Sequence, residues 1–282
     1  MNLYVDVSAF RRRYVNSKEL KADDEIEILR VLNTAARAVD HHCNQEDERF
    51  FYAQTATKVF HADGRDRVWI PDLLAATTVK LDEDTDGTFE VTLASPADYW
   101  LERGGHSDVN ATPKTLLRLN QYRGQRTSLT ERPRLLEIAG RWGYTEETET
   151  VGTINEDLDT TETPITVATG EGARYAIGQT LLIDNEQVYV TAVDGDTLTA
   201  PRAVNGTTAA THGNGSLVKR FVYVPEVVEA TMIQAGHLWE RRKVPSATRI
   251  VNPVVGSIEM NRGVDPDVCE LLEPFVRQAV FA

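Results

Sequence analysis

The clearest hydrophobic pattern in the chain lies between Pro225 and Lys243. Apolar side chains recur there at steps of four, three and four, which places them on one face of an α-helix. They are Val228, Met232, Ala235 and Trp239. Pro225 suits the first turn of a helix, and the basic residues from Arg241 to Lys243 suit the last turn, where the helix dipole favours cations. The pattern therefore predicts an amphipathic helix over 225–243.

Two other stretches also have helical spacing. Between Asp23 and His42, acidic residues come first and apolar residues follow at steps of four, three and four. The apolar ones are Ile28, Leu32, Ala35 and Val39. Near the C-terminus, Asp265-Pro266 opens a short predicted helix that continues to Phe275 and Val276. We expect the apolar stripes of the 23–42 and 225–243 helices to pack together, because a hydrophobic stripe needs a partner.

Residues 49–144 predict β-structure. Several segments are rich in Val, Thr, Phe and Tyr, and glycine-containing turns separate them. The segments are Arg49–Phe60, Val68–Leu81, Thr88–Leu93, Leu116–Leu119 and Arg134–Gly140. The turns are Asp63-Gly64, Asp86-Gly87 and Gly104-Gly105.

The composition changes after Tyr144. Residues 145–163 contain many Thr and Glu but few apolar residues, which predicts a linker or an exposed edge. A second β-rich block follows, with strands predicted near 164–168, 180–184, 187–192, 197–199 and 216–222. Residues 145–222 hold twelve acidic and four basic residues, a net charge of −8. Most of the acidity of the chain therefore lies in this block.

Composition limits the class of protein. At 282 residues we expect two domains, and no run of eighteen apolar residues or signal-peptide-like start indicates export or a membrane span. The chain has 43 acidic and 30 basic residues, a net charge of −13, which argues against a protein that grips nucleic-acid phosphates. Cys43 and Cys269 are the only cysteines, so one chain cannot build a disulfide framework or a cysteine-rich zinc site.

One stretch has the residues of a metal site. Asp82–Gly87 matches the first half of a calcium-binding loop, with acids at alternate positions and glycine sixth. The twelfth position, a bidentate glutamate in such loops, is Leu93 here. We therefore interpret the stretch as an acidic hairpin turn between strands that end near Leu81 and start near Thr88, and we expect no metal or cofactor.

The sequence shows no local signature of catalysis. It has no phosphate-binding glycine loop with its lysine, no nucleophile elbow and no histidine spacing of a metal hydrolase. His41-His42-Cys43 are neighbours on a predicted helix and point about 100° apart, so they do not converge on a metal. We predict that the protein is not an enzyme and expect no catalytic, cofactor-binding or metal-binding residues.

Several stretches, in this order along the chain, resemble the head-to-tail connector (adaptor, head completion) proteins of tailed bacteriophages. With residues 145–222 removed, "RLLEIAGRWGY" at 134–144 runs into "VPEVVEATMIQAGHLWERRK" at 224–243. The other stretches are "RFFY" at 49–52, "VWIPDLLAATTVKLDEDTDGTFE" at 68–90, "DYWLE" at 98–102 and "DPDVCELLEPF" at 265–275. The stretch 178–218 is similar to a small β module that recurs in phage structural proteins.

The resemblance implies an α+β fold. A helical core domain with attached β-strands would comprise residues 1–144 plus 223–282, and an all-β domain would be inserted at 145–222. It also implies a structural virion protein, made in the host cytoplasm, that forms an oligomeric ring, typically of twelve copies, in the neck between the portal protein and the tail or stopper proteins. The genome would pass through the ring without specific binding, for which an acidic lumen would be useful.

Other functions stay open. The protein could be another neck or tail-completion protein of the same virion. It could instead be a β-rich, glycan-directed binding module on a helical scaffold, a hypothesis that rests on Tyr175 and Tyr189 being exposed. An enzyme is the third alternative to a connector protein.

Two segments are candidates for partner contacts. An apolar C-terminal segment of a soluble chain needs a surface, and its members are Leu271, Leu272, Phe275, Val276 and Phe281. The alternative is that this segment packs on its own domain. Arg11, Arg12 and Arg13 are a second candidate, for contact with an acidic neighbour.

Overall fold

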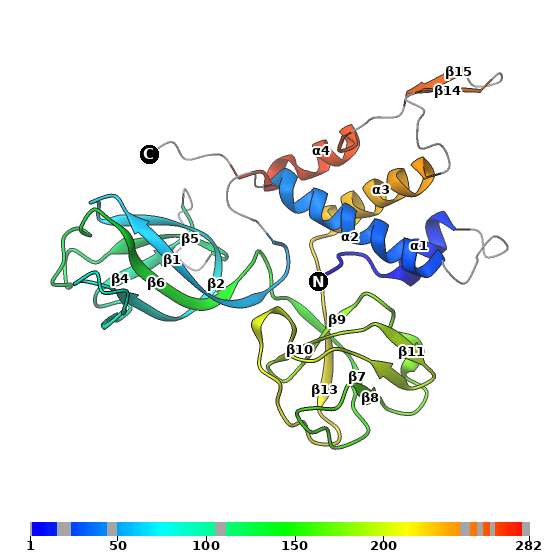
Figure 1. Ribbon diagram of the computed structural model, residues 1–282, viewed down its shortest axis with the longest axis horizontal. Helices are drawn as coiled ribbons and strands as arrows, with labels where there is room; N and C mark the ends of the chain where they lie inside the picture. Colours follow the sequence, from blue (N-terminus) through cyan, green and yellow to red (C-terminus); the bar gives the residue numbers. More distant parts are fainter. Residues whose placement is uncertain are drawn as a thin grey trace. The chain divides into compact units, whose positions relative to one another are not determined.

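The computed structural model (Figure 1) has the predicted α+β class. It describes residues 2–15, 24–43, 50–104, 111–242, 249–252, 256–259 and 263–277. The chain divides into two compact units. One comprises Met1–Glu48 with Glu147–Ala282, and the other, which we call the sheet unit, comprises Arg49–Glu146. No helix in the described ranges is long and apolar enough to cross a membrane.

Four α-helices in the first unit form what we call the helical core. They are α1 (Val7–Tyr14), α2 (Asp24–Cys43), α3 (Pro225–Arg241) and α4 (Pro266–Leu272). The predicted stripes of α2 and α3 do meet, because Ile28 and Leu32 share one buried cluster with Ala235 and Trp239. Phe10 of α1 completes that cluster and lies edge-on to Trp239. The helix α1 falls in a stretch for which the pattern predicted no element.

The sheet unit is one antiparallel sheet in the order β1-β6-β2-β5-β4, with β3 paired to β2. Its strands are β1 (Gln54–Ala62), β2 (Arg67–Leu81), β3 (Val91–Leu93), β4 (Tyr99–Glu102), β5 (Lys114–Leu119) and β6 (Arg132–Trp142). The long strand β2 has irregular register against β5 and β6, and such bulges bend a strand. The curled sheet in Figure 1 encloses a core that includes Ile70, Leu117, Leu136 and Trp142.

Residues 147–222 form a second β-body, which we call the β module. Its strands are β7 (Thr148–Thr153), β8 (Pro164–Thr166), β9 (Thr180–Ile183), β10 (Glu186–Tyr189), β11 (Ala192–Asp194), β12 (Thr197–Thr199) and β13 (Leu217–Phe221). They form two sheets, β10-β9-β13-β7 and β11-β12-β8. The stretch predicted as linker or exposed edge contains β7, the last strand of the four-stranded sheet. A separate apolar core fills the module.

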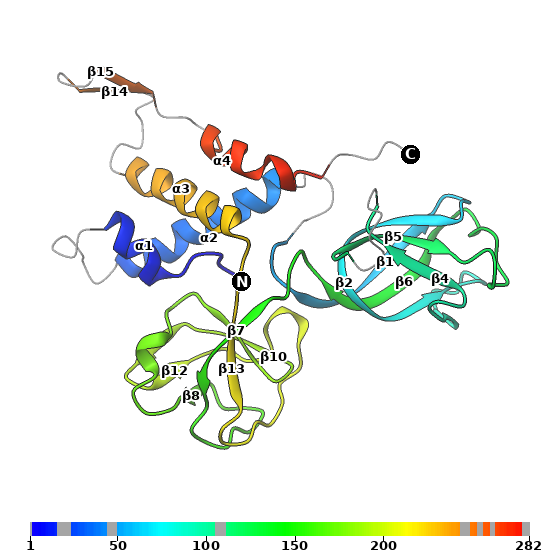
Figure 2. The same ribbon diagram turned by 180° about the vertical axis from the view of Figure 1, so that it is seen from behind.

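The two ends of the β module lie side by side. Figure 2 shows β7 and β13 together, with Thr148 opposite Phe221 in their antiparallel pairing. The N–H of Val222 donates to the carbonyl of Glu147 at 2.9 Å. Adjacent ends are the geometry that allows a body to be inserted in a chain without disturbing its host.

The sheet unit has an apolar core of its own. All the buried residues of this core come from between Ala62 and Trp142, and the division into a 1–144 plus 223–282 domain and a 145–222 domain stays a prediction. The helical cluster draws instead on the N-terminal segment, α1, α2 and α3. The physical reason is that a curled sheet buries its own inner face, so it needs no helix to cover it. A further antiparallel pair, β14 (Arg249–Asn252) with β15 (Gly256–Glu259), was not predicted.

Candidate functional site

The C-terminal candidate residues divide between the core and the surface. Val268 and Leu272 of α4 are fully buried, Leu271 and Phe275 are half-buried, and Val276 is 40% exposed. The N–H of Arg277 donates to the carbonyl of Cys43, at the end of α2, at 2.9 Å. The segment therefore packs on its own helices through Leu272, and Val276 is the exposed member. Phe281 lies outside the described residues.

The arginine candidates also divide. Arg13 forms a bidentate ion pair with Glu229 of α3, with both N–O distances 2.7 Å, and this hydrogen bonding lowers the pKa of Glu229. Arg11 lies 3.8 Å from Glu25 of α2. Arg12 is exposed and forms no ion pair with any described residue. Two of the three guanidiniums thus connect helices within the chain, which leaves Arg12 for an external partner.

The acidic turn joins β2 to β3, as predicted. The buried Asp82 accepts hydrogen bonds from the N–H groups of Thr85, at 2.7 Å, and Gly87, at 3.0 Å. Asp86 accepts from the N–H of Thr88, which lowers the pKa of Asp86.

The same turn gathers four carboxylates. Oxygen atoms of Asp82, Asp84, Asp86 and Glu90 lie within 4.8 Å of one another and could hold a divalent cation. Glu90, and not the buried Leu93 at the twelfth position, completes this group. However, the oxygens of Asp82 already accept hydrogen bonds from the turn's own amides, so the hairpin accounts for the arrangement.

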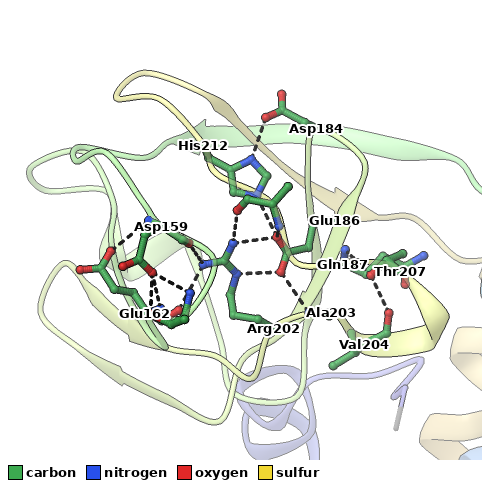
Figure 3. A network of polar contacts seen from close by, with 12 residues as sticks. Asp159, Glu162, Asp184, Glu186, Gln187, Arg202, Ala203, Val204, Thr207 and His212 are labelled. Carbon is green, nitrogen blue, oxygen red and sulfur yellow. Dashed lines mark hydrogen bonds and ion pairs between the residues drawn. The ribbon is translucent and has the colours of Figure 1, made fainter.

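The β module contains a buried charged network (Figure 3), which no sequence pattern indicated. Arg202 donates to both carboxylate oxygens of Glu186 at 2.7 Å, and both side chains are almost fully buried. The remaining guanidinium N–H groups reach the carbonyls of Asp159, Glu162 and Ala210. All five donors of Arg202 therefore have an acceptor.

The carboxylate oxygens of Glu186 are also fully hydrogen-bonded. Its carboxylate also accepts from the N–H groups of Ala203, at 3.0 Å, and Ala210, at 2.9 Å. His212 lies between two carboxylates, with Nε2 3.0 Å from Glu186 and Nδ1 2.7 Å from Asp184. Burial by itself would raise the pKa of Glu186, but the hydrogen bonds from Arg202, Ala210 and His212 outweigh it and lower the pKa to about 2.

The saturation of this network indicates a structural role. It ties the 159–162 and 202–212 loops to β10, and neither Glu186 nor Arg202 has a polar atom left for a substrate. Sequence reasoning missed it because Asp159, Glu186, Arg202 and His212 are far apart in the chain. The one local signal is an acid, Glu186, at the first position of the strand β10.

The N-terminal segment attaches the helical core to the β module. Asn2 is fully buried, accepts from Thr180 Oγ1 at 2.5 Å and exchanges hydrogen bonds with Asn205. Asp6 caps α1 by accepting from Ala9 N–H and also accepts from Gln179 Nε2 at 3.0 Å. A cavity of about 260 Å³ lies beside this attachment. The charged groups that line it are Asp6, Glu149 and Arg220, and Glu149 and Arg220 form an ion pair.

The two tyrosines on which the glycan hypothesis rests do not form an exposed aromatic surface. Tyr175 is 5% exposed and belongs to the core of the β module, so the expectation that it is exposed was wrong. Tyr189 is half-buried, and burial raises its pKa. The exposed aromatic residues of the described chain lie instead in the sheet unit, namely Tyr122 and Trp69.

The sequence matches no known protein family and no curated protein.

Proposed function

We propose that this chain is a structural component of a tailed-bacteriophage virion, an adaptor that forms an oligomeric ring in the neck between portal and tail. One observation carries the proposal beyond the sequence resemblance. The segment that resembles connector proteins after the break, 224–243, contains α3 (Pro225–Arg241), and this helix packs on α2 in a single helical cluster. The helical core is thus a scaffold that two β-bodies interrupt between α2 and α3.

The charge of the chain supports a role beside a moving polyanion. A net charge of −13 disfavours tight binding to phosphates, and the β module contributes most of the excess. We propose that the genome passes through the ring without specific binding. A basic lumen in the assembled ring would contradict this part of the proposal.

The proposed neighbours are further copies of the chain, the portal protein, and the tail or stopper proteins. Val276 is an exposed member of the C-terminal segment, and Arg12 is the exposed arginine that forms no ion pair with a described residue; these two are proposed to touch the neighbours. Removing everything after Asp265 is a poor test, because Val268 and Leu272 are fully buried and the truncation would open the helical core. The substitutions Val276→Glu and Arg12→Glu change the surface alone.

The test is to purify virions and ask whether they contain the chain, and whether it co-purifies with the portal protein. We expect the wild-type protein in both, in a stoichiometry that fits a ring. Val276→Glu is expected to reduce portal binding, with Ile26→Glu, also on an exposed apolar side chain, as the matched control. Absence of the chain from purified virions would contradict the proposal.

Another neck or tail-completion protein remains the second candidate, and the neighbour recovered by cross-linking on virions separates the two. The glycan-directed alternative has no support from Tyr175, which is buried.

A further inference from the structure

The outer face of the sheet unit carries an unusual row of side chains. In the β2-β5-β4 part of the sheet, Arg67 lies directly opposite Arg118, and Arg118 lies directly opposite Trp100. Side chains alternate between faces along a strand, and the intervening residues Val68 and Leu117 belong to the core. The row therefore lies on the outside. Trp69, which is 38% exposed, lies two residues further along the same face.

This row has an excess of positive charge. Like charges directly opposite each other on neighbouring strands destabilise a sheet unless an anion lies nearby. Glu102 supplies one, 3.3 Å from Arg118 Nε. Arg67 forms no ion pair with any residue that the structure describes.

A tight loop follows β5 at the end of the sheet where Arg67 and Arg118 lie opposite each other. The buried Asn120, just after β5, accepts from the N–H groups of Tyr122 and Arg123 and donates to the carbonyl of Pro96. A Cβ at Gly124 would lie 2.7 Å from the carbonyl oxygen of Asn120, so the turn is tight there. The loop presents Tyr122, 91% exposed, beside the exposed Arg123. Arg123, too, lacks an ion pair within the described ranges.

Four of these residues lie on the outer face of the sheet and two lie in the loop after β5, and we call the six together the arginine–aromatic face: Arg67, Trp69, Trp100, Arg118, Tyr122 and Arg123. Trp, Tyr and Arg are the residue types that dominate the energetics of protein interfaces. A preorganised loop also loses little conformational entropy on binding. Guanidiniums without carboxylate partners fit an acidic protein surface.

The β module of the same protein offers such a surface. The loop between β7 and β8, residues 155–163, exposes Asp157, Asp159 and Glu162, and none of them forms an ion pair with a described residue. Hydrogen bonds from the backbone N–H of Thr161 and from its hydroxyl lower the pKa of Asp159, so it is ionised. We call this segment the acidic loop.

We propose that the arginine–aromatic face of one copy docks on the acidic loop of a second copy. The inference rests on the proposed self-assembly into a ring and names the surfaces that would make it. A face and a loop at different places on the chain make a head-to-tail contact, which generates a ring when the rotation closes.

The first experiment measures self-association of the full chain by sedimentation at several concentrations. Arg123→Glu is expected to weaken association by about tenfold or more, because it places a carboxylate against carboxylates. The matched control is Arg134→Glu, the same charge change at an exposed arginine outside the arginine–aromatic face that forms no ion pair with a described residue, and it should associate like wild type. Combining Arg123→Glu with Glu162→Arg should restore much of the lost association.

The second experiment identifies the surfaces. A 1:1 mixture of unlabelled and nitrogen-15-labelled Arg123→Lys protein is treated with a carbodiimide, which joins amines to carboxylates in direct contact. We expect cross-links between the introduced lysine and the acidic loop that pair one light and one heavy peptide.

The proposal is overturned if Arg123→Glu associates like wild type, if the protein stays monomeric at every concentration, or if the cross-links join other segments. If virions incorporate the Arg123→Glu protein normally, the proposed contact is wrong and the proposed function is unaffected. If the wild-type chain is absent from virions, the proposed function is wrong. The sedimentation and cross-linking experiments would then still test whether two copies make the proposed contact.

Discussion

The sheet unit and the β module are both built from antiparallel strands, yet they use charge differently. Residues 49–146 hold fourteen acidic and thirteen basic residues, a net charge of −1, whereas residues 147–222 hold eleven and four, a net charge of −7. The sheet unit closes around a core that includes Leu136 and Trp142. The β module adds the buried Glu186–Arg202 pair, which holds its loops in place. An acidic surface and a buried ion network thus occur in the same body.

The sheet unit and the β module should therefore lose stability in response to different changes. An apolar core loses stability when atoms are removed from it, but it is indifferent to pH. A buried ion network loses stability when one partner is neutralised, because the other charge is then buried without compensation. Substitutions and pH should therefore separate the two bodies, and hydrogen exchange of their backbone amides reads each body independently.

The largest expected effect is that of Glu186→Gln. It leaves Arg202 buried without its carboxylate, which should cost the β module about 4 kcal/mol of unfolding free energy. The measurement is hydrogen exchange in β9, β10 and β13. The matched control is Glu149→Gln, whose partner Arg220 is at the surface, and it should cost less than about 1 kcal/mol. Equal losses from the two variants would refute the structural role of the network.

Low pH should destabilise the β module before it destabilises the sheet unit, and this is the second-largest expected effect. The pKa of Glu186 is about 2 in the folded protein, against an ordinary value of 4.5. The depressed pKa contributes stability that is fully present above the unfolded value and is lost as the pH falls from about 4.5 towards 2, a contribution of roughly 3 kcal/mol. We expect amide exchange in the β module to accelerate over this range before that of the sheet unit. Glu186→Gln should remove this difference.

Leu136→Ala is the corresponding test of the sheet unit. The side chain is fully buried in its core, and its loss should cost about 3 kcal/mol through lost burial and the cavity left behind. Exchange should accelerate in β1, β2 and β6 and stay unchanged in the β module. Leu217→Ala, on a half-exposed side chain of β13, is the conservative control and should have little effect. Acceleration in both bodies would show that they unfold as one.

The smallest expected effect comes from Asn120→Ala in the sheet unit. This neutral side chain bonds the N–H groups of Tyr122 and Arg123 and the carbonyl of Pro96, and its loss should cost about 1.5 kcal/mol. The effect should be local, with faster exchange at the amides of 121–124 and little elsewhere. Loss of the whole sheet unit's protection would mean that the loop is part of its core.

Much of the helical architecture could be predicted. The 23–42 pattern corresponds to α2, Asp24–Cys43, and the 225–243 pattern to α3, Pro225–Arg241. Periodicity at 3.6 residues is a local property, and Asp265-Pro266 likewise marks the start of α4 because capping involves neighbours only. The short α1 escaped prediction, because three consecutive arginines obscure its two buried residues, Val7 and Phe10.

Alternation predicted strands between 49 and 144, but it does not say which surface covers their apolar face. In the structure that face is covered by the sheet's own curl. The expectation that Tyr175 is exposed was wrong for a related reason. Its burial depends on residues that are distant in the chain, and the turn-rich sequence around it does not show them.

The two principal helices, the β-rich blocks, the acidic turn and the concentration of negative charge after Tyr144 could all be predicted from the sequence. These follow from the spacing and composition of neighbouring residues. Which charges are paired and which are exposed depends on how the chain folds. Arg13 pairs with Glu229 and Arg202 with Glu186, residues far away in the chain. Arg67, on the outer face of the sheet, and Arg123, in the exposed loop after β5, form no ion pair with a described residue. The physical reason is that an ion pair depends on distance in space, which the chain sets only when it has folded.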